Sequence, residues 1–546
     1  MWPTAFGGHL GWLHPAQGKT VRPVGVVIVN GVGRDARCAY RPLQDLAETL
    51  AADGFSTLRY DHAGEGDSLD VRAGEDQVAV WSDGVAQAVQ ALKSATGLDR
   101  VAVIGLRLGG ALAALGAPDA DGLVLLAPVV SGGQWMRELK LAGRMSATFH
   151  EDNGSLEAEG LHLPAKAVKA LQKIDLTKQV KAHGDVLMAL PHGSADDLTA
   201  ALREGGARVT SIAFPDSASL FADAHSNTAP EQTFGEVRRW LGERYPMSAR
   251  PPPAEPPKLV SLKPPGATEA AVSFGHGLRG VLCTPEGERL GSKAVVFCNT
   301  GGDPRAGIGG FAANAARSLA ARGVSSLRFD FAGFGDSEPA VENHVFDTSR
   351  LSDFAAAVDL LAELGFSDLT LVGICSGAYH ALLAAEADTR VTRLLLVNPI
   401  KLTWTDSDTV AAVTDQLGKS TRSYVRASTG MDAWRRLLTG KIDVRAVAKT
   451  LMTRHLSQPH GKARRQQTRV LRQRMQVLAN RGVKVQILGG HMDGCLDEVE
   501  RYFGRDGRML TAMGIGITIE EDLDHGLALS HSRKIAQDVL TVLVLD

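Results

Sequence analysis

The chain carries two copies of one pattern, and the copies differ at a residue that matters chemically. Residues 105–109 are GLRLG and residues 373–377 are GICSG, 268 positions later. Residues 58–68 (LRYDHAGEGDS) return at nearly the same offset as residues 327–337 (LRFDFAGFGDS). A near-constant offset over so much of the chain indicates that a whole domain has been duplicated. The central residue of the first pair of blocks is arginine in one copy and cysteine in the other.

A proline-rich stretch separates the two copies. Residues 246–268 contain one run of three prolines and two pairs of prolines. Such a stretch favours an extended polyproline conformation and does not fit inside a sheet. We therefore predict an N-terminal domain at 1–245, a linker at 246–268 and a C-terminal domain at 269–546, each domain long enough to bury a full core.

Both halves alternate short apolar runs with amphipathic segments. Residues 26–29 and 294–297 are unbroken apolar runs, as expected of strands that are covered on both faces. Residues 43–52 and 312–322 have helical patterns, and a glycine follows each. This alternation predicts an α/β fold with a mostly parallel, doubly wound sheet in each half. A long helix-rich insertion follows a strand in each half, at about 401–481 in the second, and predicts a lid.

Composition excludes several classes of protein. The formal net charge is −2, so nothing in the overall charge favours nucleic acid as a partner. No apolar stretch approaches the ~18 residues of a membrane span, and the N-terminus lacks the pattern of a signal peptide. The five cysteines have no paired spacing, which favours a reducing cytoplasm. No dinucleotide motif is complete, and we expect neither a cofactor nor a metal.

Each repeated GxxxG-like block follows an apolar strand and precedes a helical segment. Glycines on both sides of a central residue permit a turn too tight for a Cβ atom, which lifts the central side chain off the sheet. The turn also places the next backbone N–H beside that side chain. The residues at the apex are Arg107 and Cys375.

With these motifs the sequence resembles the α/β-hydrolase superfamily over nearly all of both halves. The most similar branch carries an L-R-x-D-x-x-G-x-G-D-S signature and includes serine-aminopeptidase-like and exosortase-system-associated hydrolases. In that superfamily the catalytic order is nucleophile, acid, histidine. The resemblance implies Cys375 as nucleophile, Asp493 after an apolar run as acid, and His525 in a late loop as base. The competing acids are Asp497 and Asp524, and the competing bases are His491 and His531.

An oxyanion hole requires two backbone donors. We expect one from Ser376, and the other from Thr300 or Gly301 in the loop after the strand at 294–297, where the superfamily usually has His-Gly and this chain does not. Two other interpretations of the elbow stay open. In the first, Cys375 is a buried, inert thiol. In the second, Ser376 is a displaced nucleophile.

The N-terminal half lacks the full set. Arg107 stays protonated and cannot attack a carbonyl carbon. Asp196 and His225 stand roughly where an acid and a histidine belong, which indicates a degenerate site in a pseudoenzyme domain. Arg107 then either holds an anion in the old pocket or pairs with Asp196 or Asp197 and only stabilises the fold.

The predicted function is cysteine-dependent acyl transfer, by a thioesterase, an esterase or an acyltransferase that forms a thioester acyl-enzyme. The substrate is a small-molecule acyl compound, free or bound to a carrier protein or coenzyme A. A basic run in the second insertion has two interpretations. It docks an acidic carrier protein, or it is only the solvated face of a helix. It comprises Lys462, Arg464, Arg465, Arg469, Arg472 and Arg474. The alternative function is a non-catalytic binding or scaffold protein made of two degenerate domains. A further interpretation is that the N-terminal half covers the active half, so that the two halves form an intramolecular pseudo-dimer.

Overall fold

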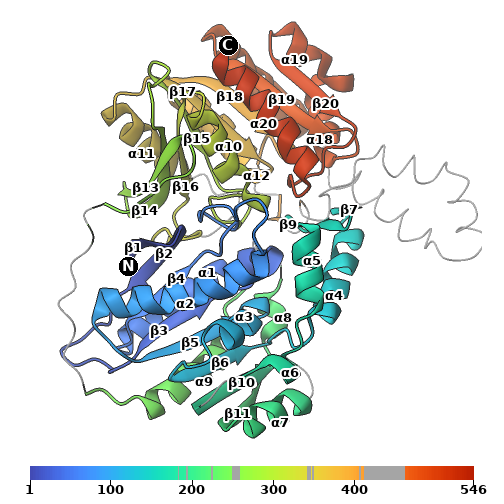
Figure 1. The fold of residues 1–546 in the computed structure, drawn as a ribbon. Coiled ribbons are helices and arrows are strands. Elements are labelled where there is room, and N and C mark those ends of the chain that lie inside the picture. Colours follow the sequence, from blue (N-terminus) through green and yellow to red (C-terminus); the bar gives the residue numbers. More distant parts are fainter. Residues whose placement is uncertain are drawn as a thin grey trace, which may run out of the picture.

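The two halves of the chain form two domains that lie one on the other, with the N-terminal domain below in Figure 1. The computed structural model describes residues 1–181, 184–191, 195–222, 226–248, 257, 259–340, 346, 350–404, 408–410, 413 and 462–546. Most of the predicted lid at 401–481 therefore lies outside the described residues. Part of the predicted linker at 246–268 lies outside them as well.

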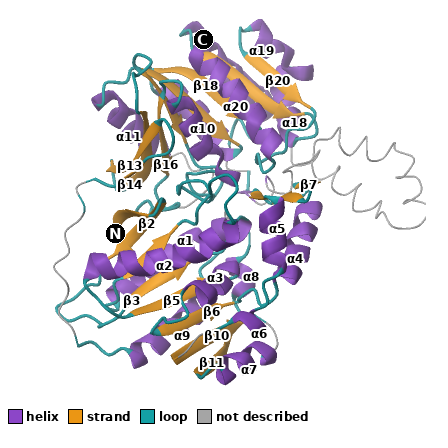
Figure 2. Ribbon diagram, in the orientation of Figure 1, coloured by secondary structure: helices purple, strands orange, loops and turns teal. Residues whose placement is uncertain are grey.

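The N-terminal domain is built on an eight-stranded sheet that is parallel except at one edge (Figure 2). In spatial order its strands are β1 (Trp2–Phe6), β2 (His9–His14), β4 (Thr57–Tyr60), β3 (Gly25–Val29), β5 (Val101–Leu106), β6 (Gly122–Leu126), β10 (Gly184–Leu190) and β11 (Ala207–Ala213). Strands β3 to β6 are fully buried, because helices cover both faces of the sheet.

The C-terminal domain repeats this order with one more edge strand. Its strands are β12 (Ser261–Leu262), β13 (Ala267–Phe274), β14 (Leu278–Pro285), β16 (Ser325–Asp330), β15 (Lys293–Phe297), β17 (Asp368–Ile374), β18 (Val391–Val397), β19 (Lys484–Gly490) and β20 (Gly516–Glu520). β12 and the start of β13 fall inside the stretch predicted as linker. The predicted parallel, doubly wound architecture of both halves is confirmed.

Equivalent helices cover equivalent faces of the two sheets. The pairs on one face are α1 (Arg34–Ala52) with α9 (Glu231–Arg244), and α10 (Phe311–Ala320) with α20 (Ser530–Leu545). The other face of the first sheet is covered by α2 (Gln77–Thr96) and α3 (Leu108–Gly116). The corresponding face of the second sheet is covered by α11 (Arg350–Glu363), α12 (Ser376–Ala387), α17 (Lys462–Asn480), α18 (Gly494–Phe503) and α19 (Arg508–Ala512). None of the described helices is long and apolar enough to cross a membrane.

Helix α1 begins nine residues before the predicted start, and it crosses a proline. Pro42 has no N–H, so the carbonyl of Cys38, four residues earlier, loses its helical donor. The side-chain amide of Asn227 donates to that carbonyl instead. The helix therefore continues through Pro42 because a distant side chain satisfies the freed backbone oxygen.

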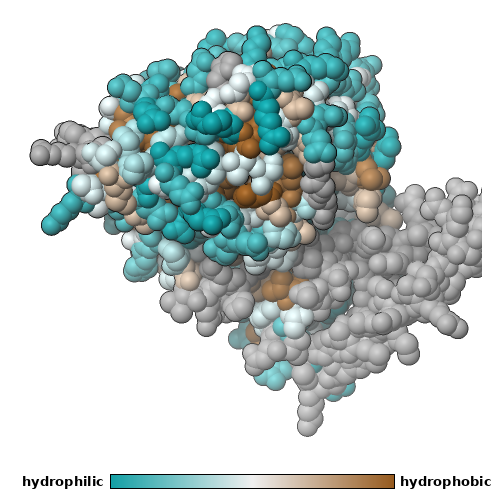
Figure 3. Space-filling model, turned by 90° about the horizontal axis from the view of Figure 1, so that it is seen from below, coloured by the Kyte–Doolittle hydropathy of each residue, from teal (hydrophilic) through white to brown (hydrophobic). Residues whose placement is uncertain are grey.

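The insertion of the N-terminal domain caps the carboxyl ends of its strands. It contains α4 (Gly132–Met145), a three-stranded sheet of β7 (Phe149–Asp152), β8 (Ser155–Ala158) and β9 (Leu161–Leu163), and then α5 (Ala165–Gln172) and α6 (Leu176–Gln179). The remaining short helices of this domain are α7 (Asp196–Glu204) and α8 (Ser217–Leu220). Of the described residues seen from below, most are hydrophilic, and the hydrophobic ones lie in small patches (Figure 3).

The two domains meet through buried ion pairs that follow the repeat. Arg59 binds Asp336, and Arg328 Nε lies 2.6 Å from Asp67 Oδ1. Arg59 and Arg328 occupy equivalent positions of the repeated block, as do Asp67 and Asp336. The arginine of each copy thus binds the aspartate of the other, as across the two-fold axis of an isologous dimer.

Arg305 lies at the centre of this interface and is 1% exposed. Its guanidinium nitrogens lie 2.6 Å from Asp67, 2.5 Å from Asp330 and 2.6 Å from Asp336. Glu269 accepts a further hydrogen bond from Arg328 at 2.7 Å. We call these residues, together with Arg59, the interface cluster.

Burial would raise the pKa of Asp67 and Asp336, but the surrounding guanidinium groups outweigh it and hold both pKa values below the usual range. A carboxyl with a lowered pKa stabilises the folded state above its ordinary pKa of about 3.9. That stability is lost as the pH falls through the folded-state pKa. Removing one partner from a buried ion pair leaves an uncompensated charge and destabilises by about 3–5 kcal/mol.

Arg305→Met is therefore expected to lower the free energy of unfolding by about 3–5 kcal/mol, because three carboxyl groups lose their shared cation. Urea unfolding followed by circular dichroism measures the change. Arg208→Met is the matched control, since the Arg208 side chain is 74% exposed in its pair with Asp185. Equal midpoints for the two variants would contradict a structural role for the interface cluster.

Candidate active site

Cys375 stands at a strained turn between β17 and α12. Its backbone has φ 54° and ψ −115°, in the region that glycine favours. A Cβ on Gly373 would lie 2.2 Å from the carbonyl oxygen of Gly377, and a Cβ on Gly377 would lie 2.6 Å from that of Asn299. The two glycines are therefore required by the close packing of the turn.

Arg107 occupies the same turn in the N-terminal domain, between β5 and α3. Its φ of 53° and ψ of −121° nearly equal those of Cys375. A Cβ on Gly105 or Gly109 would again meet backbone atoms, at 2.5 and 2.1 Å. Both repeated blocks are thus strand-to-helix elbows, as the sequence predicted.

The structure brings Asp493 and His525 together. Asp493 follows β19, is 2% exposed and caps the N-terminus of α18, where it accepts a hydrogen bond from the backbone N–H of Cys495 at 2.8 Å. His525 Nδ1 lies 2.7 Å from the other carboxylate oxygen, Oδ2. Because a carboxylate only accepts, Nδ1 carries the proton and Nε2 is left as the basic nitrogen.

His525 also interacts with Cys375. Burial lowers the pKa of His525, but the Asp493 carboxylate and then the Cys375 sulfur outweigh it and raise that pKa well above its usual value. Among the described residues His525 Nε2 is buried and makes no hydrogen bond of ordinary geometry. The imidazole is therefore placed to exchange a proton with the Cys375 thiol.

Asn398 holds the loop of His525, and sequence reasoning missed it. The side-chain amide donates to the carbonyls of Asp524 and His525, at 3.0 and 2.9 Å, and accepts from Gly490 N at 2.9 Å. Asn398 directly follows β18 and has φ 44°, a conformation that asparagine tolerates better than most residues. A polar residue at the end of a buried strand was the available signal.

The competing acid and bases have other contacts. Asp524 accepts from the backbone of Ala528 and Leu529 at 2.6 and 3.1 Å, and so shapes the loop. His531 Nε2 lies 2.6 Å from the carbonyl oxygen of Asp522. His491 Nδ1 lies 3.6 Å from Glu521.

The loop expected to complete an oxyanion hole is fixed by hydrogen bonds. Asn299 lies two residues after the end of β15. Its amide donates to the carbonyl of Asp303 at 2.8 Å and to Asp330 at 2.9 Å, and its oxygen accepts from Phe331 N at 2.6 Å. Because Asp330 belongs to the interface cluster, the loop is tied to the contact between the domains.

One of the two predicted donors in this loop is already engaged. The N–H of Gly301 donates to the hydroxyl of Ser376 at 2.9 Å, and Ser376 is 2% exposed. Within the described part of the chain the N–H of Thr300 has no hydrogen-bond partner. A buried hydroxyl held in this way is poorly placed to be a displaced nucleophile.

An apolar wall stands beside Cys375. The sulfur packs against a cluster that includes Phe346, Tyr379 and Ile400. Trp404 stacks on Phe346 with ring centroids 4.4 Å apart and an angle of 8° between the planes.

In the site predicted to be degenerate, the ion-pair partners of Arg107 differ from those predicted. Arg107 binds Asp35 at 3.2 Å and Glu138 at 3.0 Å, so the pairing predicted with Asp196 or Asp197 is corrected. Asp196 is the first residue of α7, and His225 lies outside the described residues. Sequence reasoning missed these partners because Asp35 lies in a helix after β3 and Glu138 in the insertion. Two acidic partners leave Arg107 less able to hold a free anion.

Comparison with known proteins agrees with the fold of the two domains. Residues 24–201 match the family model of serine aminopeptidase, S33, and residues 295–538 match that of the alpha/beta hydrolase family. No significant match was found among curated protein sequences.

Comparison with solved structures found proteins of low sequence identity to this chain. Est1E from Butyrivibrio proteoclasticus with bound ferulic acid is 17% identical, over 44% of this chain and 98% of its own, with a TM-score of 0.33. A putative dienelactone hydrolase from Klebsiella pneumoniae is 14% identical, over 51% and 98%, with a TM-score of 0.32. The 2,6-dihydroxy-pseudo-oxynicotine hydrolase is 18% identical, over 60% and 80%, also with a TM-score of 0.32. At these scores the structures carry no argument about this chain.

His525→Ala is expected to slow alkylation of Cys375 by iodoacetamide at neutral pH by about tenfold or more, because no base beside the sulfur then takes the thiol proton. Peptide mass spectrometry separates Cys375 from the other four thiols. His531→Ala, a histidine near the same loop, serves as the control and should alkylate normally. An unchanged rate in His525→Ala would mean that the imidazole does not act on the thiol.

Proposed function

We propose that this protein, a chain of two α/β-hydrolase domains, is a cysteine-dependent acyl-transfer enzyme with its active centre in the C-terminal domain. It acts as a thioesterase or esterase, or as an acyltransferase, and forms a thioester acyl-enzyme on Cys375. The observation that carries the proposal is the hydrogen bond between His525 and the buried Asp493, next to the elbow that presents Cys375.

The geometry supports the following sequence of steps. His525 Nε2 takes the proton of the Cys375 thiol, and the sulfur attacks the carbonyl carbon of the substrate. The N–H groups of Ser376 and Thr300 stabilise the negative oxygen that forms. The carbon–oxygen or carbon–sulfur bond to the leaving group then breaks, and His525 returns the proton to the leaving group. Water or a second acceptor next attacks the thioester, with His525 as base, and frees Cys375.

The surroundings of Cys375 favour an acyl group that is largely apolar. The wall of Phe346, Tyr379 and Trp404 offers rings and no charged group to the acyl chain. A thiolate nucleophile suits thioester exchange better than amide hydrolysis, which favours thioesters over peptides.

The positive charge of helix α17 is an argument for a substrate bound to a carrier protein or to coenzyme A. Arg464, Arg465, Arg469 and Arg472 line one shallow hollow on this helix. A group of guanidinium side chains attracts phosphate or an acidic carrier protein by long-range electrostatics. We also assign the enzyme to the cytoplasm, because all five cysteines are free thiols.

The N-terminal domain is a pseudoenzyme that supports its neighbour. A guanidinium cannot attack a carbonyl, and the ion pairs of Arg107 account for its charge. The reciprocal pairs Arg59–Asp336 and Arg328–Asp67 support an intramolecular pseudo-dimer.

One observation favours the alternative of a non-catalytic binding or scaffold protein. The Gly301 N–H, an expected oxyanion donor, is engaged by the Ser376 hydroxyl. A scaffold has no need of an open oxyanion hole, whereas the enzyme proposed here relies on Thr300 for the second donor.

Cys375→Ala is expected to abolish turnover of thioester and activated-ester substrates while the protein stays folded. The wild-type chain incubated with p-nitrophenyl acetate should gain one acetyl group on Cys375 in its peptide mass spectrum. Ser376→Ala is the control, and it should keep activity within about tenfold because it retains the backbone N–H. Acylation at Ser376, or near-normal rates in Cys375→Ala, would refute the assignment. The absence of any acyl adduct would favour the scaffold.

Arg107→Ala is expected to leave kcat of the C-terminal site within a few-fold, because no acyl chemistry passes through a guanidinium. Its effect should appear as lower stability, since Asp35 loses its partner. Steady-state kinetics together with thermal unfolding measures both. A collapse of kcat in a folded protein would instead require one active site built from both domains.

A further inference from the structure

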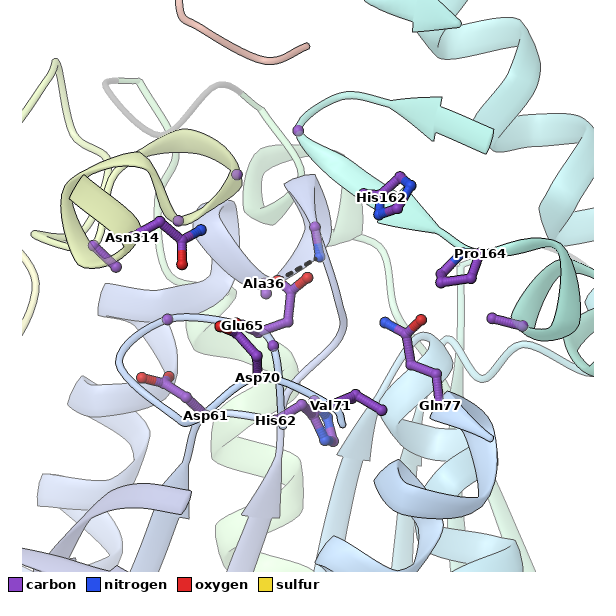
Figure 4. Close-up of a pocket in the computed structure, with 18 of the residues that line it drawn as sticks. Ala36, Asp61, His62, Glu65, Asp70, Val71, Gln77, His162, Pro164 and Asn314 are labelled. Atoms are coloured by element: carbon purple, nitrogen blue, oxygen red, sulfur yellow. Dashed lines mark hydrogen bonds between the residues drawn. The ribbon is translucent and has the colours of Figure 1, made fainter. Parts of the chain in front are cut away.

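A cavity of about 520 Å³ lies between the domains, away from the elbows (Figure 4). Among the described residues neither Cys375, His525 nor Arg107 lines it. Its volume falls within the ~300–1,000 Å³ typical of small-molecule sites. Its walls come from the loops after β3 and β4, the starts of α2 and α5, β9, and the starts of α10 and α20 of the other domain.

Several polar side chains face this cavity without a protein partner. Gln77 at the start of α2 is 9% exposed, and its amide makes no hydrogen bond among the described residues. Figure 4 shows it pointing into the cavity, with His162 and Pro164 above it and Asn314 on the far side. The exposed side chains of Asn314 and His162 also have no hydrogen-bond partner within the described part of the chain. Polar side chains that line a cavity and bind no protein group are available to a ligand or to water.

Two half-buried carboxyl groups add to this set. Asp61 accepts from Asp67 N at 2.9 Å, and Glu65 accepts from Gly33 N at 3.0 Å, each through one oxygen. Burial raises the pKa of both Asp61 and Glu65 to about 7. Near neutral pH these carboxyls therefore both donate and accept hydrogen bonds.

The cavity is unsuited to an anion. Its half-buried cations are engaged by the protein: Arg37 binds Asp303 at 2.6 Å, and Arg533 donates to the carbonyls of Leu527 and Ala528. Arg72 also lines the cavity, and its side chain is exposed to solvent. Lys166 donates to a backbone carbonyl at 3.1 Å. An anion would also meet the carboxyl groups of the cavity.

A cation is disfavoured as well. The guanidinium groups of Arg37 and Arg533 lie close enough to Glu65 to act against the effect of burial on its pKa. They would repel an ammonium group at the same place. The remaining class is a neutral ligand that both donates and accepts hydrogen bonds.

We propose that this cavity binds a neutral, polyhydroxylated small molecule of the size of a mono- or disaccharide. The amides of Gln77 and Asn314 each present a donor and an acceptor, which suits neighbouring hydroxyl groups. The carboxyls of Asp61 and Glu65 take further hydroxyls, and Pro164 covers the C–H face of the ligand. The site is independent of the acyl chemistry proposed for Cys375.

The test uses the full chain and saturation-transfer NMR with glucose, galactose, N-acetylglucosamine, maltose and cellobiose, and calorimetry for the tightest binder. Spermidine and inorganic phosphate are the cationic and anionic probes. At least one sugar should bind, and Gln77→Leu should weaken it about fivefold or more, the effect of one or two lost hydrogen bonds. Asn314→Leu provides a second variant, and its thermal unfolding checks the fold.

Gln90→Leu is the matched control, because Gln90 lies on the same helix and is exposed. Binding of spermidine or phosphate in preference to every sugar would overturn the proposal. So would the absence of sugar binding, or unchanged binding in both folded leucine variants of the cavity.

Discussion

The contact between Arg305 and three aspartates is the interaction on which the rest of the structure depends. Arg305 follows Asn299 and Thr300 in one loop, and Asp330 binds both the Arg305 backbone at 2.8 Å and the Asn299 amide at 2.9 Å. The loop that faces Cys375 is therefore held by residues of the domain contact. Because Asp67 of the other domain shares Arg305, the N-terminal domain takes part in positioning the candidate site.

Close packing imposes the elbow in both domains, whichever residue stands at its apex. Both turns place a non-glycine residue at φ above 50°, and in both the flanking glycines have no room for a Cβ. Such strain persists only where the surrounding structure determines the backbone. The strand and helix of the N-terminal copy impose the turn whatever residue stands at its apex. An arginine there is tolerated because Asp35 and Glu138 neutralise it.

Sequence reasoning reached the parts that depend on local pattern. The repeat predicted two domains with the same parallel, doubly wound fold. The resemblance to the α/β-hydrolase superfamily pointed to Asp493 and His525, which the structure brings within hydrogen-bonding distance. It missed Asn398, the acidic partners of Arg107 and the interface cluster, because these depend on side chains brought together by tertiary packing. The engagement of Gly301 by Ser376 was equally invisible. The predicted lid and His225 fall mostly or wholly outside the described residues.

The reciprocal ion pairs have a consequence for how the molecule responds to dilution. Two separate subunits joined by such pairs would dissociate as their concentration fell. Here a covalent linker holds the partners together, so each domain meets the other at an effective concentration in the millimolar range or above. The contact is then independent of how much protein the cell makes. Within one chain the two surfaces are also free to differ in sequence, which the surfaces of two identical subunits are not.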